Sequence, residues 1–308
     1  MSSASEGRFP SSSVPLLTRP PRSATLLTDD GVPVEAVYEP CTAGAGTPGG
    51  EAGEGPAATP AIVVAHGFTG SADRPAVRRA ARVFARRAAV VTFSFRGHGR
   101  SGGRSTVGDR EVLDLAAAVA WARELGHSRV VTVGFSMGGS VVLRHGALYA
   151  AGPAESSTGR TAVRVPARVG RTGSSGAHSD AVVSVSAPAR WYYRGTAPMR
   201  RLHWVVTRPS GRLVGRYGLR TRIATEDWDP VPLSPVAAVP LIAPAPLLLV
   251  HGDRDPYFPL DHPRMLAEAA VPGGAELWLE RGMGHAENAA DDALLARIAD
   301  WATAAPSA

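Results

Sequence analysis

Residues Gly134–Gly138 read Gly-Phe-Ser-Met-Gly, and this stretch decides how the rest of the chain is interpreted. It follows an apolar run at 129–135 that predicts a buried strand, and a helical segment at 138–149 comes directly after it. The pattern G-x-S-x-G between a strand and a helix is typical of a tight turn that exposes a nucleophilic serine. The alternative is a chance turn in a chain with 34 glycines. The strand–turn–helix context favours Ser136 as a nucleophile.

Apolar runs and helical segments alternate on both sides of this turn. Strands are expected at 61–65, 89–95, 129–135, 181–186, 246–251 and 275–280. Helices are expected at 75–87, 109–124, 138–149, 262–270 and 289–303. Strands that are apolar throughout and alternate with helices indicate a parallel sheet covered on both faces. The predicted class is therefore α/β, a mostly parallel central sheet flanked by helices, with two short strands before it at 22–39.

The composition suits one large domain with a buried core. The chain has 308 residues, of which 44% are apolar and 19% charged. All 33 basic side chains are arginine, and the net charge of +6 is interpreted as coding bias. Because no nucleic-acid-binding module is recognisable, no nucleic-acid partner is expected. No apolar run reaches the length of about 18 residues that a membrane-spanning helix needs, so no transmembrane segment is expected.

The cysteine content and the first residues bear on the compartment. Cys41 has no second cysteine with which to form a disulfide, which fits a reducing compartment. The beginning of the sequence lacks the basic and then apolar pattern of a secretory signal. The sequence therefore predicts a cytoplasmic protein.

Composition also divides the chain into segments. Residues 1–22 are expected to be a flexible N-terminus and 23–303 the α/β domain. Within that domain, stretches at 42–60 and 151–180 that are rich in small and turn-forming residues are expected to be flexible insertions. Both lead into the beginning of a strand, whereas sites on parallel sheets lie at the carboxyl ends. Residues 187–243 follow such a carboxyl end and are predicted to form a short lid over the pocket.

A nucleophilic serine needs a base, and the base needs an acid that orients it. His285 stands out among nine histidines because it follows the strand at 275–280 through a Gly-Met-Gly loop. Three other histidines near strand ends are interpreted as loop-shaping residues: His66, His98 and His251. The loop after the strand at 246–251 offers two candidate acids, Asp253 and Asp255. The position of that loop alone leaves the choice between them open.

Several motifs, in this order, resemble the α/β-hydrolase superfamily, in particular its monoacylglycerol-lipase-like and serine-aminopeptidase-like esterases. The resemblance covers about residues 23–303 apart from the insertion at 151–180. The motifs are His66-Gly67-Phe68, Arg96-Gly97-His98-Gly99-Arg100-Ser101, the serine turn, and Gly252–Pro259 followed by Gly284-His285. Each one follows a predicted strand, and the shared order makes the resemblance specific.

The resemblance implies that Ser136, His285 and Asp255 form a catalytic triad. It favours Asp255 over Asp253 because the family spaces its acid as G-x-x-D-x-x-x-P, a pattern that begins here at residue 252. Backbone N–H groups next to the nucleophile and after the first parallel strand form the oxyanion hole in this fold, which points to Met137 and Phe68. No metal and no organic cofactor is implied.

One position departs from the family pattern. The family often has an aspartate two residues before the arginine of its R-G-H-G stretch, and this chain has Ser94 there. The role of Arg96 is therefore open, while the expected triad is unaffected.

The predicted lid has an unusual charge. Residues Arg190–Arg222 contain nine arginines and no acidic residue, with aromatic residues interleaved. The arginines are at positions 190, 194, 200, 201, 208, 212, 216, 220 and 222. One interpretation is a solvated surface on which arginine stems pack against aromatic rings. The other is attraction of an anionic substrate or an anionic membrane surface.

Together these residues predict a serine hydrolase that cleaves the carboxylic ester, thioester or amide of a small acyl substrate through an acyl-enzyme. Dehalogenases and epoxide hydrolases that resemble this chain use an aspartate nucleophile, which Ser136 argues against. Hydroxynitrile lyases of the fold rely on a lysine, and the chain has none. Perhydrolase activity uses the same triad and stays open. The alternative from another class is a non-catalytic small-molecule or anionic-surface binding protein on the same fold.

Overall fold

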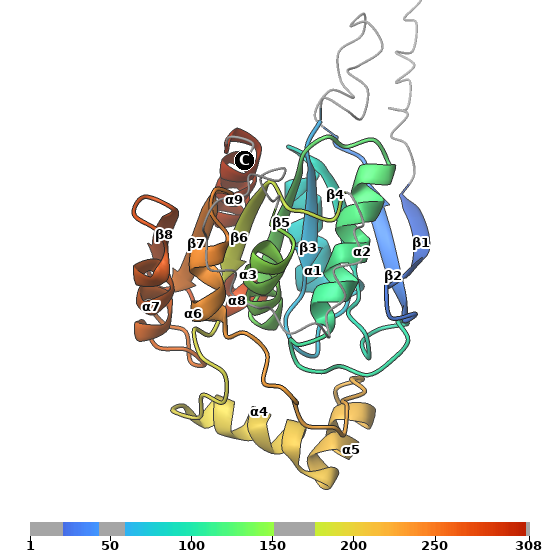
Figure 1. Ribbon diagram of the computed structural model, residues 1–308, viewed down its shortest axis with the longest axis vertical. Helices are drawn as coiled ribbons and strands as arrows, with labels where there is room; N and C mark the ends of the chain where they lie inside the picture. Colours follow the sequence, from blue (N-terminus) through green and yellow to red (C-terminus); the bar gives the residue numbers. More distant parts are fainter. Residues whose placement is uncertain (1–20, 43–58, 151–175, 306–308) are drawn as a thin grey trace, which may run out of the picture.

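The computed structural model describes residues 21–42, 59–150 and 176–305 (Figure 1). The predicted N-terminal segment and most of the insertions predicted at 42–60 and 151–180 lie outside these residues. Eight strands form one sheet, in the order β1-β2-β4-β3-β5-β6-β7-β8. Their bounds are β1 Arg22–Leu27, β2 Pro33–Glu39, β3 Ala61–Ala65, β4 Ala89–Phe93, β5 Val130–Phe135, β6 Ala181–Val185, β7 Leu247–Gly252 and β8 Ala275–Glu280.

The sheet changes direction only at its N-terminal end. β1 pairs with β2, and β2 with β4, in antiparallel fashion. From β4 through β3, β5, β6 and β7 to β8, every neighbouring pair is parallel. All residues of the five inner parallel strands are buried. Such burial requires cover on both faces, and the predicted α/β class is confirmed.

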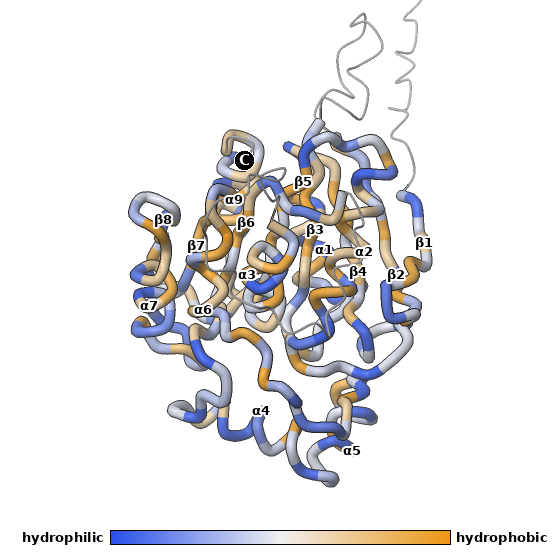
Figure 2. Tube along the Cα trace, in the orientation of Figure 1, coloured by the Kyte–Doolittle hydropathy of each residue, from blue (hydrophilic) through white to orange (hydrophobic). Residues whose placement is uncertain are grey.

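Helices supply this cover. The helices that pack on the sheet are α1 Pro75–Phe84, α2 Glu111–Glu124, α3 Met137–Leu148, α7 Asp261–Ala269 and α9 Asp292–Ala304. Two short helices pack on these: α6 Pro235–Ala238 on α3 and α7, and α8 Ala286–Ala289 on α1. Successive residues of a strand point to opposite faces, so Val63 of β3 lies in the core beneath α2 and α3, while Ile62 lies in the core beneath α1 and α9. Figure 2 shows the apolar residues gathered along these strands.

Two helix boundaries differ from the sequence expectation. The helix expected at 289–303 is present as α9 but begins at Asp292, because Ala290 is extended and separates α8 from α9. The carboxylate of Asp291 accepts a hydrogen bond from the N–H of Leu294 and begins α9 there. The helix expected at 75–87 ends at Phe84, where the N–H of Arg87 bonds to the Phe84 carbonyl in a tight turn.

The described ends of two segments expected to be flexible are held by pairing or by hydrogen bonds. β1 begins at Arg22, one residue inside the expected N-terminal segment. Asp180, at the end of the 151–180 stretch, is buried, and its carboxylate accepts hydrogen bonds from Arg123 and from the N–H of Val130, both at 2.6 Å. These residues belong to the beginning of β1 and to the turn that leads into β6.

Most of residues 187–243, here called the lid segment, lies beyond the carboxyl ends of the strands, while α6 near its end lies beside α3 (Figure 1). The segment contains α4 Ala197–Thr207 and α5 Pro209–Tyr217, and it returns through the 3₁₀ turn η1 Val239–Leu241. Its two ends are joined where the N–H of Val236 bonds to the carbonyl of Ala189 at 3.0 Å. Its returning arm pairs with the loop after β4 through an isolated bridge between Ile223 and Ser105. The first contact closes the lid segment at its base, and the bridge attaches its returning arm to the domain.

Candidate active site

Ser136 occupies the sharp turn between β5 and α3. Its backbone has φ 53° and ψ −112°, a conformation that a residue with a side chain rarely adopts. A Cβ atom at Gly134 would collide with the carbonyl of Gly138, and one at Gly138 would collide with the carbonyl of Ala65. The two glycines of the motif are thus required by close backbone approach. The turn directs the serine side chain away from the sheet at its carboxyl edge.

Ser136, His285 and Asp255 meet at this edge. His285 Nε2 lies 2.8 Å from Ser136 Oγ, and His285 Nδ1 lies 2.7 Å from Asp255 Oδ2. The Asp255 side chain is fully buried, and its other oxygen accepts hydrogen bonds from the N–H groups of Tyr257 and Phe258 at 2.8 and 3.1 Å. Both carboxylate oxygens of Asp255 therefore have fixed partners, as a buried charge requires.

Residues that follow β6 and β7 hold the His285 ring, on the loop after β8, in position. Tyr257 stacks on the ring with centroids 4.3 Å apart, and Phe258 meets it edge-on at 5.6 Å. The next residue, Ala286, has φ 54°, and its N–H donates to Ser186 Oγ at 3.1 Å. These contacts come from the ends of β6 and β7, so three strand ends position one imidazole.

Asp253 lies only two residues from Asp255 but makes a different contact. Its Oδ1 accepts a hydrogen bond from the N–H of Gly282 at 2.6 Å. The carboxylate of Asp253 thereby ties the loop after β7 to the loop after β8, away from the His285 ring. The structure brings Asp255, and not Asp253, to the histidine.

The other histidines at strand ends support loops. His66 Nδ1 lies 2.7 Å from the carbonyl of Gly67, and its Nε2 accepts the N–H of Phe95 at 3.0 Å. Burial lowers the pKa of His66 to about 3, and His98 adds to this effect. Burial also lowers the pKa of His98 and of His251. These rings stay neutral and keep the loops around the serine in place.

The N–H groups of Phe68 and Met137 are the positions expected for an oxyanion hole. Within residues 59–150 and 176–305, no acceptor is found for either group. The neighbouring N–H of Gly67 donates instead to the carboxylate of Glu287 at 3.3 Å. Glu287 is buried although it lies 220 positions further along the chain, and no sequence signal identified it as part of this edge.

A cavity of about 490 Å³ lies between this edge and the lid segment. Phe68, Met137 and Phe258 line it from the edge, while Trp191 and Trp228 line it from the lid segment. The two indole rings lie 5.1 Å apart, and each indole N–H donates to a backbone carbonyl. Only the apolar faces of these rings remain for a ligand, so the cavity suits a small molecule with substantial apolar surface.

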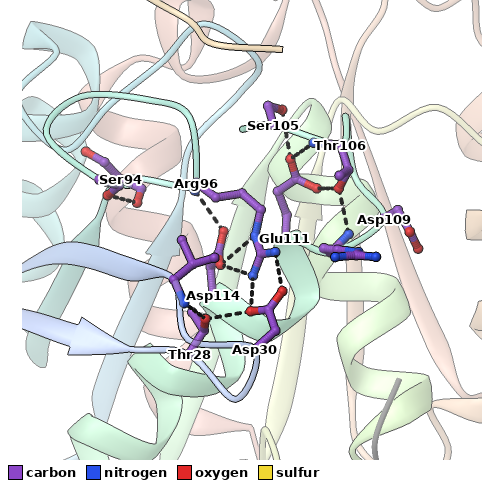
Figure 3. Close-up of polar contacts among 12 residues, drawn as sticks. Thr28, Asp30, Ser94, Arg96, Ser105, Thr106, Asp109, Glu111 and Asp114 are labelled. Atoms are coloured by element: carbon purple, nitrogen blue, oxygen red, sulfur yellow. Dashed lines mark hydrogen bonds and ion pairs between the residues drawn. The ribbon is translucent and has the colours of Figure 1, made fainter. Parts of the chain in front are cut away.

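Arg96, whose role the sequence left open, is at the centre of a buried ion-pair network (Figure 3). Its guanidinium bonds to Asp114 at 2.7 and 2.9 Å and to Asp30 at 2.7 and 2.9 Å. Burial opposes the charge of Arg96, but its two carboxylate partners raise its pKa overall. The network fastens the loop after β4 to α2 and to the turn after β1. Arg96 therefore shapes the floor of the site without contacting the triad.

Glu111 fixes the part of that loop that lines the cavity. Its buried carboxylate accepts hydrogen bonds at 2.7 to 2.9 Å from the hydroxyls of Ser105 and Thr106 and from the N–H groups of Thr106 and Gly108. Figure 3 shows Glu111 beside Arg96, with Ser105 and Thr106 directed at its carboxylate. Because Ser105 also pairs with Ile223, Glu111 orders both the cavity wall and the arm of the lid segment.

The arginines of the lid segment have few acidic partners. Arg190 pairs with Asp261 at 2.8 Å. None of the other eight between positions 194 and 222 forms an ion pair with a carboxylate in the part of the chain that the structure describes. Figure 2 shows hydrophilic residues along much of α4. Residues 190–222 of the lid segment thus carry a concentration of positive charge next to the cavity, while Glu226 and Asp227 of its returning arm add two carboxylates to the cavity lining.

Residues 21–42, 59–150 and 176–305 contain no cluster of three or more histidine, cysteine or acidic side chains suited to a metal ion. No helix among them combines the length and the apolar character needed to cross a bilayer.

Comparison with known proteins places the chain in context. The model of the alpha/beta hydrolase family matches residues 62–298. No curated protein matches the sequence significantly. Among solved structures, an esterase of Pyrococcus furiosus is 19% identical with a TM-score of 0.62, over 92% of this chain and 91% of that chain. The esterase domain of a Rhodothermus marinus protein is 17% identical with a TM-score of 0.55, over 91% of this chain and 95% of that one.

A third solved structure is an α/β serine hydrolase from Xanthomonas campestris that is described as having no lid. It is 17% identical, with a TM-score of 0.53 over 94% of both chains. At these identities the likeness concerns the fold alone.

Proposed function

Because the chain belongs to the α/β-hydrolase family, we propose that it is a serine hydrolase that cleaves a carboxylic ester through an acyl-enzyme. The observation that carries this proposal is the series of contacts from Ser136 through His285 to Asp255, at 2.8 and 2.7 Å. A general base must lie within about 3.2 Å of the atom whose proton it takes. Both contacts meet this requirement on a turn that exposes the serine. Thioesters and amides undergo the same chemistry and are the alternative substrates.

In the first half of the reaction, Ser136 Oγ attacks the carbonyl carbon while its proton passes to His285 Nε2. Asp255 keeps the Nδ1–H of the imidazole directed toward itself and stabilises the imidazolium that forms. The N–H groups of Met137 and Phe68 donate to the oxygen that becomes negative. Collapse of the tetrahedral intermediate breaks the bond to the alcohol, which leaves with the proton from His285.

In the second half, water takes the place of the alcohol. His285 accepts a proton from this water as the water attacks the acyl carbon, and then returns the proton to Ser136 Oγ as the acid leaves. None of these steps calls on a metal or an organic cofactor. The same three side chains therefore serve both halves of the cycle.

The substrate proposed is a small acyl ester held between the sheet edge and a lid formed by residues 187–243. Support comes from the cavity of about 490 Å³ and from its aromatic lining. An anionic substrate is favoured by the eight arginines of the lid segment that have no carboxylate partner within the described residues. A non-catalytic binding protein on the same fold is the alternative, and an aligned nucleophile and base argue against it.

The proposed location is the cytoplasm. Cys41 is the single cysteine of the chain and is free. The chain therefore has no internal disulfide that a reducing compartment would break. Fractionation of cells that produce the full chain with a C-terminal tag checks this proposal, since recovery outside the cell would contradict it.

A fluorophosphonate probe followed by mass spectrometry tests the proposed chemistry. The probe should add one phosphonyl group to the peptide that contains Ser136, and pre-incubation with a hydrolysable ester should slow the labelling. A panel of p-nitrophenyl esters, thioesters and anilides then ranks the substrate classes. Labelling at another residue, or the absence of turnover with every class, would remove the proposal.

A further inference from the structure

The helix α4 has two sides that differ in chemistry. The residues that line the cavity include Met199, Leu202, His203 and Val206. Arg201 and Trp204, two and five positions after Met199, are exposed. Because a helix turns by about 100° per residue, these positions lie about 200° and 140° around the helix from Met199. α4 therefore forms a wall one helix thick, with the cavity on one side and an exposed surface on the other.

α5 packs against α4 and continues this outer surface. Arg212 of α5 lines the cavity. Val214 and Tyr217, two and five positions after Arg212, repeat the spacing seen on α4 and so point away from the cavity. They are 45% and 73% exposed, and Leu213 beside them is 59% exposed. The outer side of α5 is therefore largely apolar.

The outer sides of α4 and α5 together are here called the docking face. The face consists of Arg200, Arg201, Trp204, Arg208, Leu213, Val214 and Tyr217. Among the described residues nine large apolar side chains are exposed, and four of them belong to this face although α4 and α5 have only 11 and 9 residues. The two helices lie beyond the carboxyl ends of the strands, where a broad partner can reach both (Figure 1). Exposed apolar side chains gathered in this way mark an interaction surface.

The arginines of this region indicate the charge of the partner. Six exposed arginines lie on or beside the docking face: Arg194, Arg200, Arg201, Arg208, Arg216 and Arg220. None of the six forms an ion pair with a carboxylate within residues 21–42, 59–150 and 176–305. Glu226 and Asp227, the nearest acidic residues along the chain, line the cavity. The docking face therefore combines unbalanced positive charge with aromatic and aliphatic side chains.

An anionic lipid bilayer matches this combination. Guanidinium groups bind phosphate, and each basic side chain near an anionic bilayer strengthens binding about fivefold. Trp and Tyr side chains prefer the boundary between headgroups and acyl chains. Leu and Val side chains gain free energy when they enter the apolar part of that boundary. Helices that lie in the plane of a bilayer surface carry both kinds of residue for these reasons.

Two other partners match the docking face less well. A nucleic acid would neutralise the arginines and stack its bases on Trp204 and Tyr217, but it would leave Leu213 and Val214 in water. A second copy of the chain would place arginines opposite arginines, because a two-fold interface uses the same surface of both copies. The aliphatic side chains and the uniform charge therefore favour a bilayer.

We propose that the docking face binds the surface of an anionic lipid bilayer. Only the thickness of α4, about 10 Å, separates this face from the cavity. Docking therefore brings the cavity next to apolar molecules that are dissolved in the bilayer. Binding to lipid needs no chemical step at Ser136, so the inference goes beyond the proposed hydrolysis. It is tested in the Ser136→Ala protein, with which the vesicles stay unhydrolysed.

Sedimentation with vesicles measures this binding. The full chain carrying S136A is mixed with vesicles of phosphatidylcholine, or of phosphatidylcholine with about 30% phosphatidylglycerol. The dissociation constant should be at least about tenfold lower for the anionic vesicles, and 0.5 M salt should remove most of this difference because it screens the charges. Equal binding to the two kinds of vesicle, or binding to neither, would show that the inference is wrong.

Two triple variants in the S136A background test the position of the charge. Changing Arg200, Arg201 and Arg208 to glutamine should weaken binding to the anionic vesicles by about 10- to 100-fold. The matched control loses the same charge at three exposed positions near the amino ends of the parallel strands, namely Arg22, Arg82 and Arg86. The control should stay within about threefold of the parent protein, because salt screens distant charges. Equal weakening in the two variants would trace the binding to net charge and overturn the inference.

Two valines test whether apolar side chains enter the bilayer. Val214 and Val271 are 45% and 40% exposed, and Val271 lies in the turn before β8, at the amino end of that strand. Val214→Asn should weaken binding to anionic vesicles about three- to tenfold, whereas Val271→Asn should leave it unchanged. Both variants should keep the melting temperature of the parent within a few degrees, since both sites are on the surface. An equal response of the two variants would overturn the inference.

Trp204 supplies a readout that charge alone cannot change. Brominated acyl chains should quench part of the tryptophan fluorescence when the protein binds anionic vesicles, and Trp204→Phe should remove this quenching. Quenching that is absent, or that persists in W204F, would show that the docking face does not enter the bilayer. A duplex DNA that binds more tightly than the anionic vesicles and releases the protein from them would make the face a nucleic-acid surface. Either result would remove the inference.

Discussion

Charged side chains at the carboxyl edge of the sheet have partners of opposite charge or hydrogen-bond donors, whereas most arginines of the lid segment have no carboxylate partner among the described residues. At the edge, Asp255 uses both oxygens and Arg96 contacts two carboxylates. In the lid segment, Arg190 is the one arginine found in an ion pair among the described residues. Buried charges must be paired, whereas exposed charges are stabilised by water. Single substitutions at the edge should therefore have large effects, and the lid segment should act through its summed charge.

The largest effect is expected at the nucleophile. Ser136→Ala removes the attacking oxygen and should lower kcat by about 10⁵-fold or more, as loss of a triad serine does. The free energy of unfolding should change by less than about 0.5 kcal/mol, because the serine side chain is not packed in a core. Ester hydrolysis and urea denaturation measure the two quantities. Undiminished turnover in a folded S136A protein would remove Ser136 as nucleophile.

The two aspartates of the loop after β7 provide the next comparison. Asp255→Asn should lower kcat by about 10⁴-fold, since an amide at this position favours the wrong imidazole tautomer. Asp253→Asn should retain activity within about tenfold, because asparagine keeps the oxygen that accepts the N–H of Gly282. Steady-state kinetics of both variants decide the matter. The reverse ranking in two folded proteins would make Asp253 the orienting acid.

A third prediction compares arginines in the two regions. Arg96→Ala leaves the buried carboxylate of Asp114 without its partner and should lower the free energy of unfolding by about 3 to 5 kcal/mol. Arg208→Gln, in the lid segment, should change it by less than about 0.5 kcal/mol. Urea denaturation of both variants measures the difference. Equal losses would mean that the lid arginines are as firmly held as Arg96.

The contrast between the regions also explains what the sequence could reveal. Apolar runs and the motif around Ser136 depend on neighbouring residues, so the parallel strands and the serine turn could be predicted. The partners of Arg96 could not, because Asp30 and Asp114 lie 66 and 18 positions away and only the folded sheet brings them together. Glu287 beside Gly67 went unnoticed for the same reason. Asp253 and Asp255 share a loop, so without the family's spacing the sequence could not choose between them, and in the structure their side chains point to different partners.

The buried His145 of α3 and the half-buried His203 of α4 should contribute differently to the free energy of unfolding at low pH. Burial lowers the pKa of His145 to about 3, so between about pH 6.5 and pH 3 the unfolded chain binds a proton that the folded chain does not. Stability contributed by this group is complete above pH 6.5 and is lost as the pH falls. His145→Phe should reduce the slope of unfolding free energy against pH by up to about 1.4 kcal/mol per pH unit in this window.

The control for this prediction is His203 on α4, which is half-buried and whose pKa is lowered by burial and by Arg194. His203→Gln should change the slope less than His145→Phe does. Urea denaturation at several pH values between 4 and 7 supplies both slopes. An unchanged slope in H145F would show that the histidine is protonated in the folded protein as well.

The smallest effect concerns the summed charge of the lid segment. Arg200, Arg201 and Arg208 are exposed, and none has a carboxylate partner in the described parts of the chain. Their field should speed the capture of an anionic ester and should weaken with salt, since the Debye length is about 8 Å at physiological ionic strength. The kcat/KM for 2-nitro-4-sulfophenyl butyrate should therefore fall about two- to tenfold between low salt and 0.5 M salt, while 4-nitrophenyl butyrate should respond far less.

Two triple variants decide whether position or net charge matters for this capture. Changing Arg200, Arg201 and Arg208 to glutamine should reproduce the high-salt rate for the sulfonated ester only. The matched control changes Arg22, Arg82 and Arg86 to glutamine; these exposed residues lie near the amino ends of the parallel strands, where the same loss of charge is remote from the cavity. The control variant should behave as wild type on both esters, because screening confines the field to its own neighbourhood. An equal response of the two variants would trace the salt effect to net charge, and no response in either would make the lid arginines an ordinary solvated surface.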